Sequence, residues 1–142
     1  MSTTYVPVAL RKRVTHKARL RCGYCLRSEE LMGMPMTIEH IIPQALGGPT
    51  TEQNLWLACP SCNQFKGTQI QAHDPQSGET VKRFNPRLQV WEEHFAWSTD
   101  GTQMIGKTPC GRATVIALQM NNPEIIVTRR LWVSAGWWPP GD

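Results

Sequence analysis

The sequence predicts an α+β domain built around a small metal-stapled core, and three features carry this prediction. Short strand-like runs alternate with helical patterns, and no apolar run is long enough to span a membrane. Eleven prolines and six tryptophans favour short elements anchored by aromatic side chains. Four of the five cysteines form two Cys-x-x-Cys pairs, Cys22/Cys25 and Cys59/Cys62. We expect residues 1–70 to hold the metal core and residues 71–142 to form an extension that packs on it within one domain.

The N-terminal segment combines helical spacing with positive charge. Residues 7–20 predict a helix whose apolar face comprises Val8, Leu10, Val14, Ala18 and Leu20. Residues 1–27 contain seven Lys/Arg and no acid, whereas the rest of the chain holds eight Lys/Arg against eleven acids. This charge distribution favours a polyanionic partner, although a solvated basic helix would show the same pattern. The candidate phosphate contacts are Arg11, Lys12, Lys17, Arg19 and, further along the chain, Lys66.

The central part of the sequence predicts two strands followed by a helix. Alternating polarity indicates a strand at 36–42, which Pro43 ends. A second short strand is expected at 54–58, ending on Cys59. A loop at 44–53 bends at Gly47-Gly48-Pro49, and a helix at 60–70 follows the second cysteine pair. An antiparallel strand pair with this helix docked on it would bring together Glu39, His40, Asn54 and Asn63.

The second half of the sequence predicts short elements separated by turns. Residues 72–86 are loop-rich, with a short strand at 80–84. A helix at 88–95 would place Trp91 and Phe95 on one face, because they are four residues apart. Asp100-Gly101 is a two-residue turn signal and predicts a hairpin at 97–106. Helices are expected at 111–120 and 123–135.

The two cysteine pairs indicate a structural Zn²⁺ site. Zinc prefers four tetrahedral sulfur or nitrogen ligands, and two such pairs supply four thiolates. With all four positions filled by protein, the metal stabilises the fold and performs no chemistry. The alternative to a zinc site is four reduced, buried cysteines that bind no metal. A redox-active pair is disfavoured, because no thioredoxin-like strand–helix context surrounds either pair. The absence of a secretory signal predicts a soluble, cytoplasmic protein.

A second metal site is expected at the polar residues between the cysteine pairs. The Glu39 carboxylate and the Asn63 amide oxygen are ligands suited to Mg²⁺ or Mn²⁺. His40 titrates near neutrality and is the natural general base for activating a water molecule. A lone histidine on a strand is more often a hydrogen-bonded structural residue. The alternative interpretation is catalysis, which requires Glu39, Asn54 and Asn63 to lie beside His40.

Residues 37–67 resemble the HNH endonuclease family. The resemblance is carried by EHIIP (39–43), the glycine pair (47–48), NLWLAC (54–59), CPSCNQFKG (59–67) and the upstream knuckle RCGYC (21–25). It implies a ββα-metal (His-Me finger) core with a structural zinc, and divalent-metal-dependent hydrolysis of DNA to 5′-phosphate and 3′-hydroxyl ends. The later segments FNPRLQVWEEHFAW (84–97), CGRATVIAL (110–118) and RRLWVSAGW (129–137) resemble the tail of stand-alone bacterial, cyanobacterial-type members.

The resemblance also implies a role for each residue of the motif. His40 is the general base, Glu39 is a metal ligand where many members have Asp, and Asn54 holds the His40 loop. Asn63 stands where the family often has its last histidine, so the chain is an HNN variant. An amide oxygen is an adequate ligand for a hard cation, so this departure is compatible with activity. DNA, expected to be double-stranded, is the implied partner.

Two other classes of protein share part of this pattern. A zinc-stabilised module that binds DNA without cutting it explains the cysteines and the basic helix, but leaves Glu39-His40 and Asn63 without a role. A zinc deaminase also combines Cys-x-x-Cys with His and Glu. Its order is His-x-Glu followed by Pro-Cys-x-x-Cys, whereas here the acid directly precedes the histidine and no proline precedes Cys59.

Overall fold

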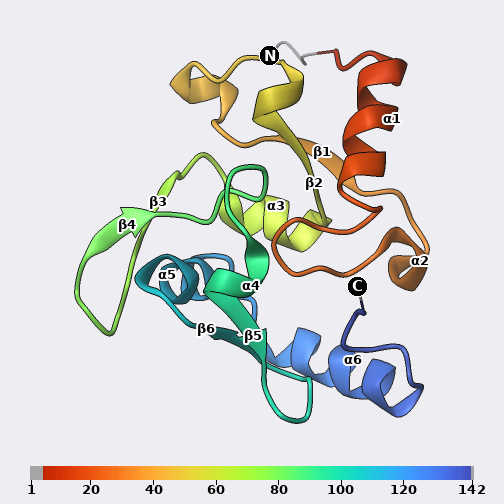
Figure 1. The fold of residues 1–142 in the computed structure, drawn as a ribbon, viewed down its shortest axis with the longest axis vertical. Helices are drawn as coiled ribbons and strands as arrows, with labels where there is room; N and C mark the ends of the chain where they lie inside the picture. Colours follow the sequence, from red (N-terminus) through yellow and green to blue (C-terminus); the bar gives the residue numbers. More distant parts are fainter. Residues whose placement is uncertain (1–4, 142) are drawn as a thin grey trace. The chain divides into compact units, whose positions relative to one another are not determined.

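A computed structural model describes residues 5–141, and the chain falls into two units, Met1–Gln69 and Ile70–Asp142 (Figure 1). Between residues 5 and 69, the first unit contains three α-helices, two strands and two 3₁₀ turns. These are α1 (Val8–Lys17), α2 (Glu29–Met32), β1 (Thr37–His40), η1 (Gln44–Leu46), η2 (Glu52–Asn54), β2 (Leu55–Ala58) and α3 (Pro60–Lys66). This mixture of helices and small antiparallel sheets confirms the predicted α+β class.

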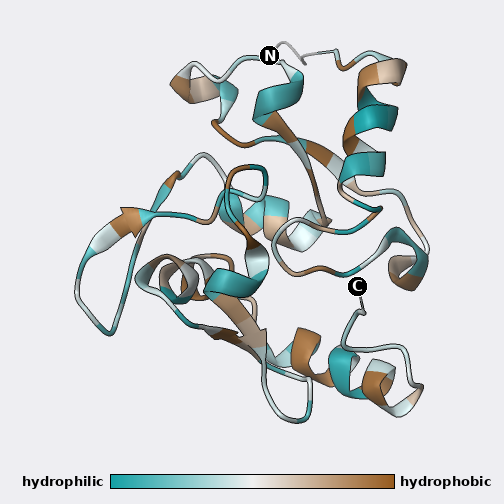
Figure 2. Ribbon diagram, viewed as in Figure 1, coloured by the Kyte–Doolittle hydropathy of each residue, from teal (hydrophilic) through white to brown (hydrophobic). Residues whose placement is uncertain are grey.

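The strand pair β1–β2 forms the centre of the first unit. The strands are antiparallel, with Glu39 opposite Trp56 and His40 opposite Leu55. Leu55 and Leu57 are buried, and Figure 2 shows hydrophobic segments along both strands. Burial of these apolar side chains holds the pair in register, because a slip of one residue would turn them to the opposite face. Both predicted strands are therefore present, although the first is shorter than expected.

Helix α3 begins at the second cysteine pair. The Cys62 amide lies 3.4 Å from the Cys59 Sγ, which caps the helix, and Pro60 occupies the first turn, where no amide donor is needed. The helix ends at Lys66, because Gly67 adopts φ 52° and ψ −133°. The prediction that the helix continues to residue 70 is therefore wrong.

Helix α1 buries a narrower face than the sequence predicted. Val14 and Ala18 are buried, but Val8 and Leu20 are 61% and 47% exposed. The helix ends at Lys17, and Arg19 and Leu20 then adopt left-handed backbone angles, with φ of 59° and 57°. This reversal removes Leu20 from the apolar face. No helix among residues 5–141 has the length and hydrophobicity to cross a membrane.

The described part of the second unit, residues 70–141, contains two hairpins and three helices. Its elements are β3 (Gln71–His73), β4 (Thr80–Lys82), α4 (Trp91–His94), β5 (Phe95–Trp97), β6 (Met104–Gly106), α5 (Pro109–Ala117) and α6 (Pro123–Ser134). The predicted strand near 80–84 is present, but its partner β3 lies in a segment expected to be loop. The helices expected at 111–120 and 123–135 are confirmed with small shifts at their ends.

The hairpin β5–β6 differs from its prediction in the length of its turn. Trp97 pairs with Met104, so six residues connect the strands instead of two. The Asp100 carboxylate organises this longer turn by accepting hydrogen bonds from the Ser98 hydroxyl at 2.8 Å and the Thr102 amide at 3.0 Å. Helix α4 is a single turn, and Phe95 begins the strand, so the predicted helix through residue 95 is wrong.

Close backbone packing and aromatic stacking hold the second unit together. A Cβ atom on Gly111 would lie 2.1 Å from the His94 carbonyl oxygen, so only glycine fits where α5 meets this chain segment. The Arg129 guanidinium lies 5.1 Å from the ring centre of Trp97 and donates to the Thr102 carbonyl at 3.0 Å. Trp97 and Trp138 stack edge to face at 4.9 Å. We assign this cluster to stability.

Candidate metal centre and catalytic site

The four cysteines of the two pairs converge in the first unit. Their Sγ atoms all lie within 4.8 Å of one another, and all four residues are buried. The Sγ atoms of Cys25 and Cys59 are 3.7 Å apart. A tetrahedral zinc with bonds of about 2.3 Å places its sulfur ligands about 3.8 Å apart, so the donor set fits Zn²⁺. The predicted four-cysteine cluster is therefore present with the spacing a structural zinc requires.

Neighbouring groups stabilise negative charge on Cys25 within this cluster. Arg27 Nε donates to the Cys25 Sγ at 3.2 Å. Burial alone would raise the pKa of the Cys25 thiol, but hydrogen bonds from the other three cysteines and the Arg27 charge lower that pKa well below its usual value. The Gly23 amide donates to the Leu57 carbonyl at 2.9 Å and ties the first knuckle to β2. A zinc bound here would join the end of α1 to the start of α3.

Tyr24, inside the first knuckle, links the cysteine cluster to Glu39. The Tyr24 hydroxyl donates to the Glu39 Oε1, and both residues are buried. This contact depends on the folding of the knuckle against β1, so the spacing of residues in the sequence did not indicate it. The Glu39 carboxylate, which is expected to bind a catalytic metal, is thus held by a residue that lies between two of the clustered cysteines.

Lys66 approaches the same carboxylate from α3. Its Nζ lies 3.5 Å from the Glu39 Oε2 and donates to the His40 carbonyl oxygen at 3.0 Å. Glu39 is 3% exposed and Lys66 is 4% exposed. This burial does not fit the phosphate contact predicted for Lys66, because its ammonium group faces the interior. Lys66 instead ties α3 to the Glu39-His40 dipeptide.

His40 lies at the end of β1, and its side chain is partly buried. Its Nε2 is 2.8 Å from the Thr50 Oγ1, a contact across the loop that the sequence did not reveal. Burial lowers the pKa of His40, and the positive charge of Lys66 lowers it further. Both effects favour the neutral imidazole, which is the form that accepts a proton.

Asn54 fastens the loop that follows His40. Its Oδ1 accepts from the Ile42 amide at 2.9 Å, and its Nδ2 donates to the carbonyls of Ile42 and Pro49 at 3.0 Å and 2.9 Å. Gly48 must be glycine here, because a Cβ would lie 1.7 Å from the Ile42 carbonyl oxygen. Asn54 therefore closes the loop from both sides, which places Thr50 beside His40.

Asn63 lies on α3, one turn before Lys66, and is half-buried. Within residues 5–141 its side chain makes no hydrogen bond, and it is Lys66 that contacts Glu39 directly. Around Glu39, the structure thus brings together Tyr24, Lys66 and the His40 backbone, whereas Asn63 occupies a neighbouring position on the helix.

A catalytic metal at this position would have few protein ligands. Within the described part of the chain, the four cysteines are the only group of three or more His, Cys, Asp or Glu side chains close enough to share an ion. A second metal at Glu39 would therefore have this one carboxylate, and the amide oxygen of Asn63 stays a predicted ligand. Mg²⁺ fits such a donor set, because it keeps several waters and is commonly bound by one or two carboxylates together with substrate phosphates.

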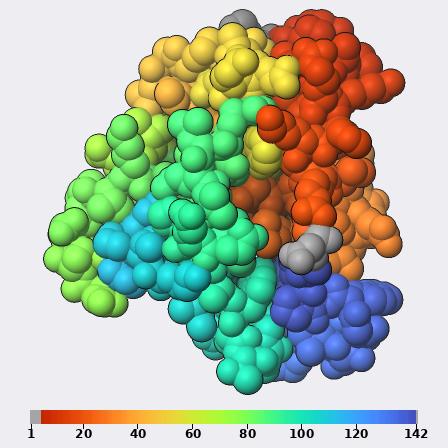
Figure 3. All heavy atoms as spheres, in the orientation of Figure 1, coloured from red at the N-terminus to blue at the C-terminus, as the bar shows by residue number. Residues whose placement is uncertain are grey.

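The predicted phosphate contacts on and after α1 are solvent-exposed: Arg11, Lys12, Lys17 and Arg19. Figure 3 shows the surface of this N-terminal segment in red. Arg13, on the same helix, pairs with Glu52 at 3.0 Å. The exposed cations are available to a polyanion, and an exposed pair such as Arg13–Glu52 adds little stability.

Residues 22–69 match the family model described as HNH endonuclease. No match to the chain was found among curated proteins or among solved structures. The matched segment includes both cysteine pairs, β1, β2 and α3. Residues 22–69 therefore match an HNH endonuclease domain and contain a four-cysteine cluster compatible with zinc, and this family match implies a nuclease-type function.

Proposed function

We propose that this protein is a divalent-metal-dependent endonuclease that hydrolyses phosphodiester bonds in DNA. The observation that carries the proposal is the partly exposed imidazole of His40 at the end of β1, next in the chain to the buried carboxylate of Glu39 and outside the cysteine cluster. A structural zinc module needs neither group. A hydrolase needs both a proton acceptor and a place for a hard cation.

His40 accepts the proton of the attacking water in this proposal. Thr50 holds the Nε2 edge of the ring through the 2.8 Å contact, and Asn54 holds the loop that carries Thr50. Lys66 favours the neutral imidazole by its charge and anchors the His40 backbone. These residues keep the base in one orientation, so little reorganisation is required when the water loses its proton.

Glu39 and Asn63 are the proposed ligands of the catalytic Mg²⁺ or Mn²⁺. When bound, that metal supplies positive charge to stabilise the phosphate and the leaving 3′ oxygen. One carboxylate and one amide give weak affinity for a free cation, so we expect the DNA phosphate to complete the binding site. Arg11, Lys12, Lys17 and Arg19 are the proposed contacts to the DNA backbone.

The second candidate function is a zinc-stabilised module that binds DNA without cutting it. The Glu39–Lys66 ion pair favours this alternative, because it already compensates the buried carboxylate that a catalytic metal would use. Both candidates share the zinc cluster and the exposed cations. They differ in whether Glu39 and His40 serve chemistry.

Nicking of supercoiled plasmid DNA tests the proposal. The zinc-loaded protein is assayed with Mg²⁺, with Mn²⁺ and without added metal, alongside His40→Ala and the control His73→Ala, which changes an exposed histidine on β3. We expect metal-dependent nicking by the parent and by His73→Ala, and its loss in His40→Ala with zinc content unchanged. Full activity in His40→Ala would contradict the assignment of the base. DNA binding by a parent that never nicks would favour the second candidate.

A further inference from the structure

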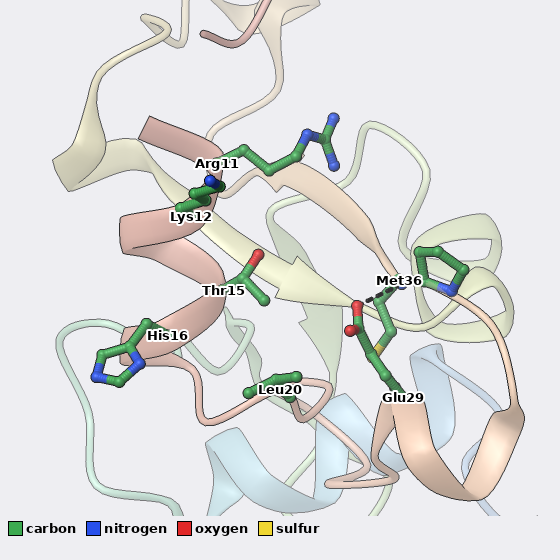
Figure 4. A pocket seen from close by; sticks show the side chains of 8 residues that line it. Arg11, Lys12, Thr15, His16, Leu20, Glu29 and Met36 are labelled. Atoms are coloured by element: carbon green, nitrogen blue, oxygen red, sulfur yellow. Dashed lines mark hydrogen bonds between the residues drawn. The ribbon is translucent and has the colours of Figure 1, made fainter. Parts of the chain in front are cut away.

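A cavity of about 340 Å³ opens between α1 and the segment that leads from α2 into β1. It lies in the range of about 300–1,000 Å³ typical of small-molecule sites. Figure 4 shows side chains from α1 on one side and Glu29 and Met36 on the other. The residues that line it are Arg11, Lys12, Thr15, His16, Leu20, Glu29, Pro35 and Met36.

One wall of this cavity is cationic. Arg11 and Thr15 are four residues apart on α1, as are Lys12 and His16, so each pair projects from the same side of the helix. Arg11 and Lys12 are exposed, and the Thr15 hydroxyl lies between their helical turn and Leu20. This wall offers two fixed positive charges and a hydroxyl donor to an anionic group.

The opposite wall combines an acceptor with apolar surface. Glu29 Oε2 accepts the Met36 amide at 2.8 Å, which fixes the carboxylate at the cavity. Only Oε2 is engaged in this bond, so Oε1 can accept from a ligand. Pro35, Met36 and Leu20 supply apolar contact. Leu20 reaches the cavity through its left-handed backbone conformation, which is unfavourable for a bulky residue and is retained where the surrounding structure requires it.

We infer that this cavity binds a nucleoside 5′-phosphate unit, with the phosphate at Arg11 and Lys12 and the base between Leu20, Met36 and Glu29. A phosphate alone would be repelled by the Glu29 carboxylate, whereas a base with an exocyclic amine would donate to it. Adenine, cytosine and guanine carry such an amine and thymine lacks one, so thymine is the weakest occupant.

The unit has two possible sources: an unpaired nucleotide in a DNA strand, or a free mononucleotide. The inference rests on the proposed function in one respect, the assumption that the nucleic acid bound by the protein is DNA. A base inside a duplex cannot enter the cavity, so occupancy by a strand requires an unpaired or extruded nucleotide. The cavity would then favour DNA with a bulge or a frayed end over fully paired DNA.

The test compares the affinity of the zinc-loaded protein, without added Mg²⁺, for two duplexes that differ by one unpaired adenine. The variants are Arg11→Gln and its matched control Arg13→Gln, which removes the same charge from the same helix outside the cavity. We expect the parent to prefer the bulged duplex. Arg11→Gln should weaken binding of the bulged duplex by about tenfold. Arg13→Gln should weaken binding of the two duplexes by equal factors, each smaller than tenfold.

A fluorescent 2-aminopurine at the unpaired position reports entry of the base directly, and replacing the adenine by thymine should reduce the preference. A second arm measures amide chemical shifts of Thr15 and Met36 during titration with deoxyadenosine monophosphate, deoxythymidine monophosphate or inorganic phosphate. Shifts with the adenine nucleotide, without any preference for the bulged duplex, support the free nucleotide as the source. Equal effects of the two arginine variants, together with shifts no larger for the nucleotides than for phosphate, overturn the inference.

These outcomes are separable from those of the proposed function. A protein that nicks DNA but shows neither bulge preference nor nucleotide shifts loses the cavity assignment and keeps the nuclease. A protein that binds the nucleotide but never nicks keeps the cavity assignment and loses the nuclease.

Discussion

Replacing Asn54 by alanine tests how the loop beside His40 is held. Asn54 is 7% exposed, and its side chain makes three hydrogen bonds to backbone groups of Ile42 and Pro49. Alanine removes one acceptor and two donors at once. The Ile42 amide and the two carbonyls then lose their partners.

The expected cost follows from those three bonds. An unsatisfied buried polar group costs about 1–3 kcal/mol. Ile42 is 46% exposed, so water can reach part of its backbone, and we take the lower limit for each bond. The free energy of unfolding of the first unit should therefore fall by roughly 3 kcal/mol. For a unit of this size that corresponds to a decrease in Tm of roughly 12–24 °C.

Urea denaturation and amide hydrogen exchange measure this effect. The Ile42 amide is the most direct reporter, because Asn54 Oδ1 is its acceptor. Asn54→Asp is the matched control: it keeps the size and the acceptor but points a second oxygen at the two carbonyls. We expect it to be at least as destabilising as alanine at neutral pH, and to recover in part at low pH, when the carboxyl becomes a donor.

Two results would refute this reasoning. One is a change below about 0.5 kcal/mol for Asn54→Ala, which is typical of a surface substitution without structural consequence. The other is an Ile42 amide that exchanges as slowly in the variant as in the parent. Either result would mean that the 41–50 loop is held by other contacts.

Three further predictions follow from the site. Gly48→Ala should destabilise the first unit, because its Cβ would lie 1.7 Å from the Ile42 carbonyl oxygen; an unchanged melting temperature would contradict this. Cys62→Ser should lower zinc content and unfold the first unit, measured by metal analysis and circular dichroism, whereas Cys110→Ser, outside the cluster, should leave zinc content unchanged. The pKa of His40 is lowered from 6.5, so kcat/KM for nicking should be constant above neutrality and fall only below about pH 6.5, as His40 gains a proton; a midpoint above pH 7 would argue against His40 as the base.

Sequence reasoning succeeded where a residue's role depends on local pattern. The cysteine spacing predicted the cluster, and the alternation around Glu39 predicted the first strand of the antiparallel pair β1–β2. Helix α6 was found because Pro123 and Gly136 mark its two ends. In each case the constraint acts between residues close in the chain, or the residue type itself indicates its role, as paired cysteines indicate metal binding.

The contacts that the sequence did not reveal join residues distant in the chain. Tyr24 reaches Glu39 only after the zinc knuckle folds against β1, and Lys66 turns inward because α3 docks beside the same carboxylate. An exposed lysine and a buried one look identical in sequence. The turn of the hairpin at residues 97–104 was predicted too short for a different, local reason. The Asp100-Gly101 signal marks a turn but not its length, which Asp100 sets through its own hydrogen bonds.

Chemical rescue of His40→Gly tests the central claim most directly. Removal of the imidazole leaves a space at the end of β1 without changing the cysteine cluster, so zinc content should be retained. We predict that the variant loses metal-dependent plasmid nicking and regains it as imidazole is added, with a pH dependence that follows the added base. Nicking by His40→Gly at the parental rate without imidazole would contradict the assignment of His40 as the general base.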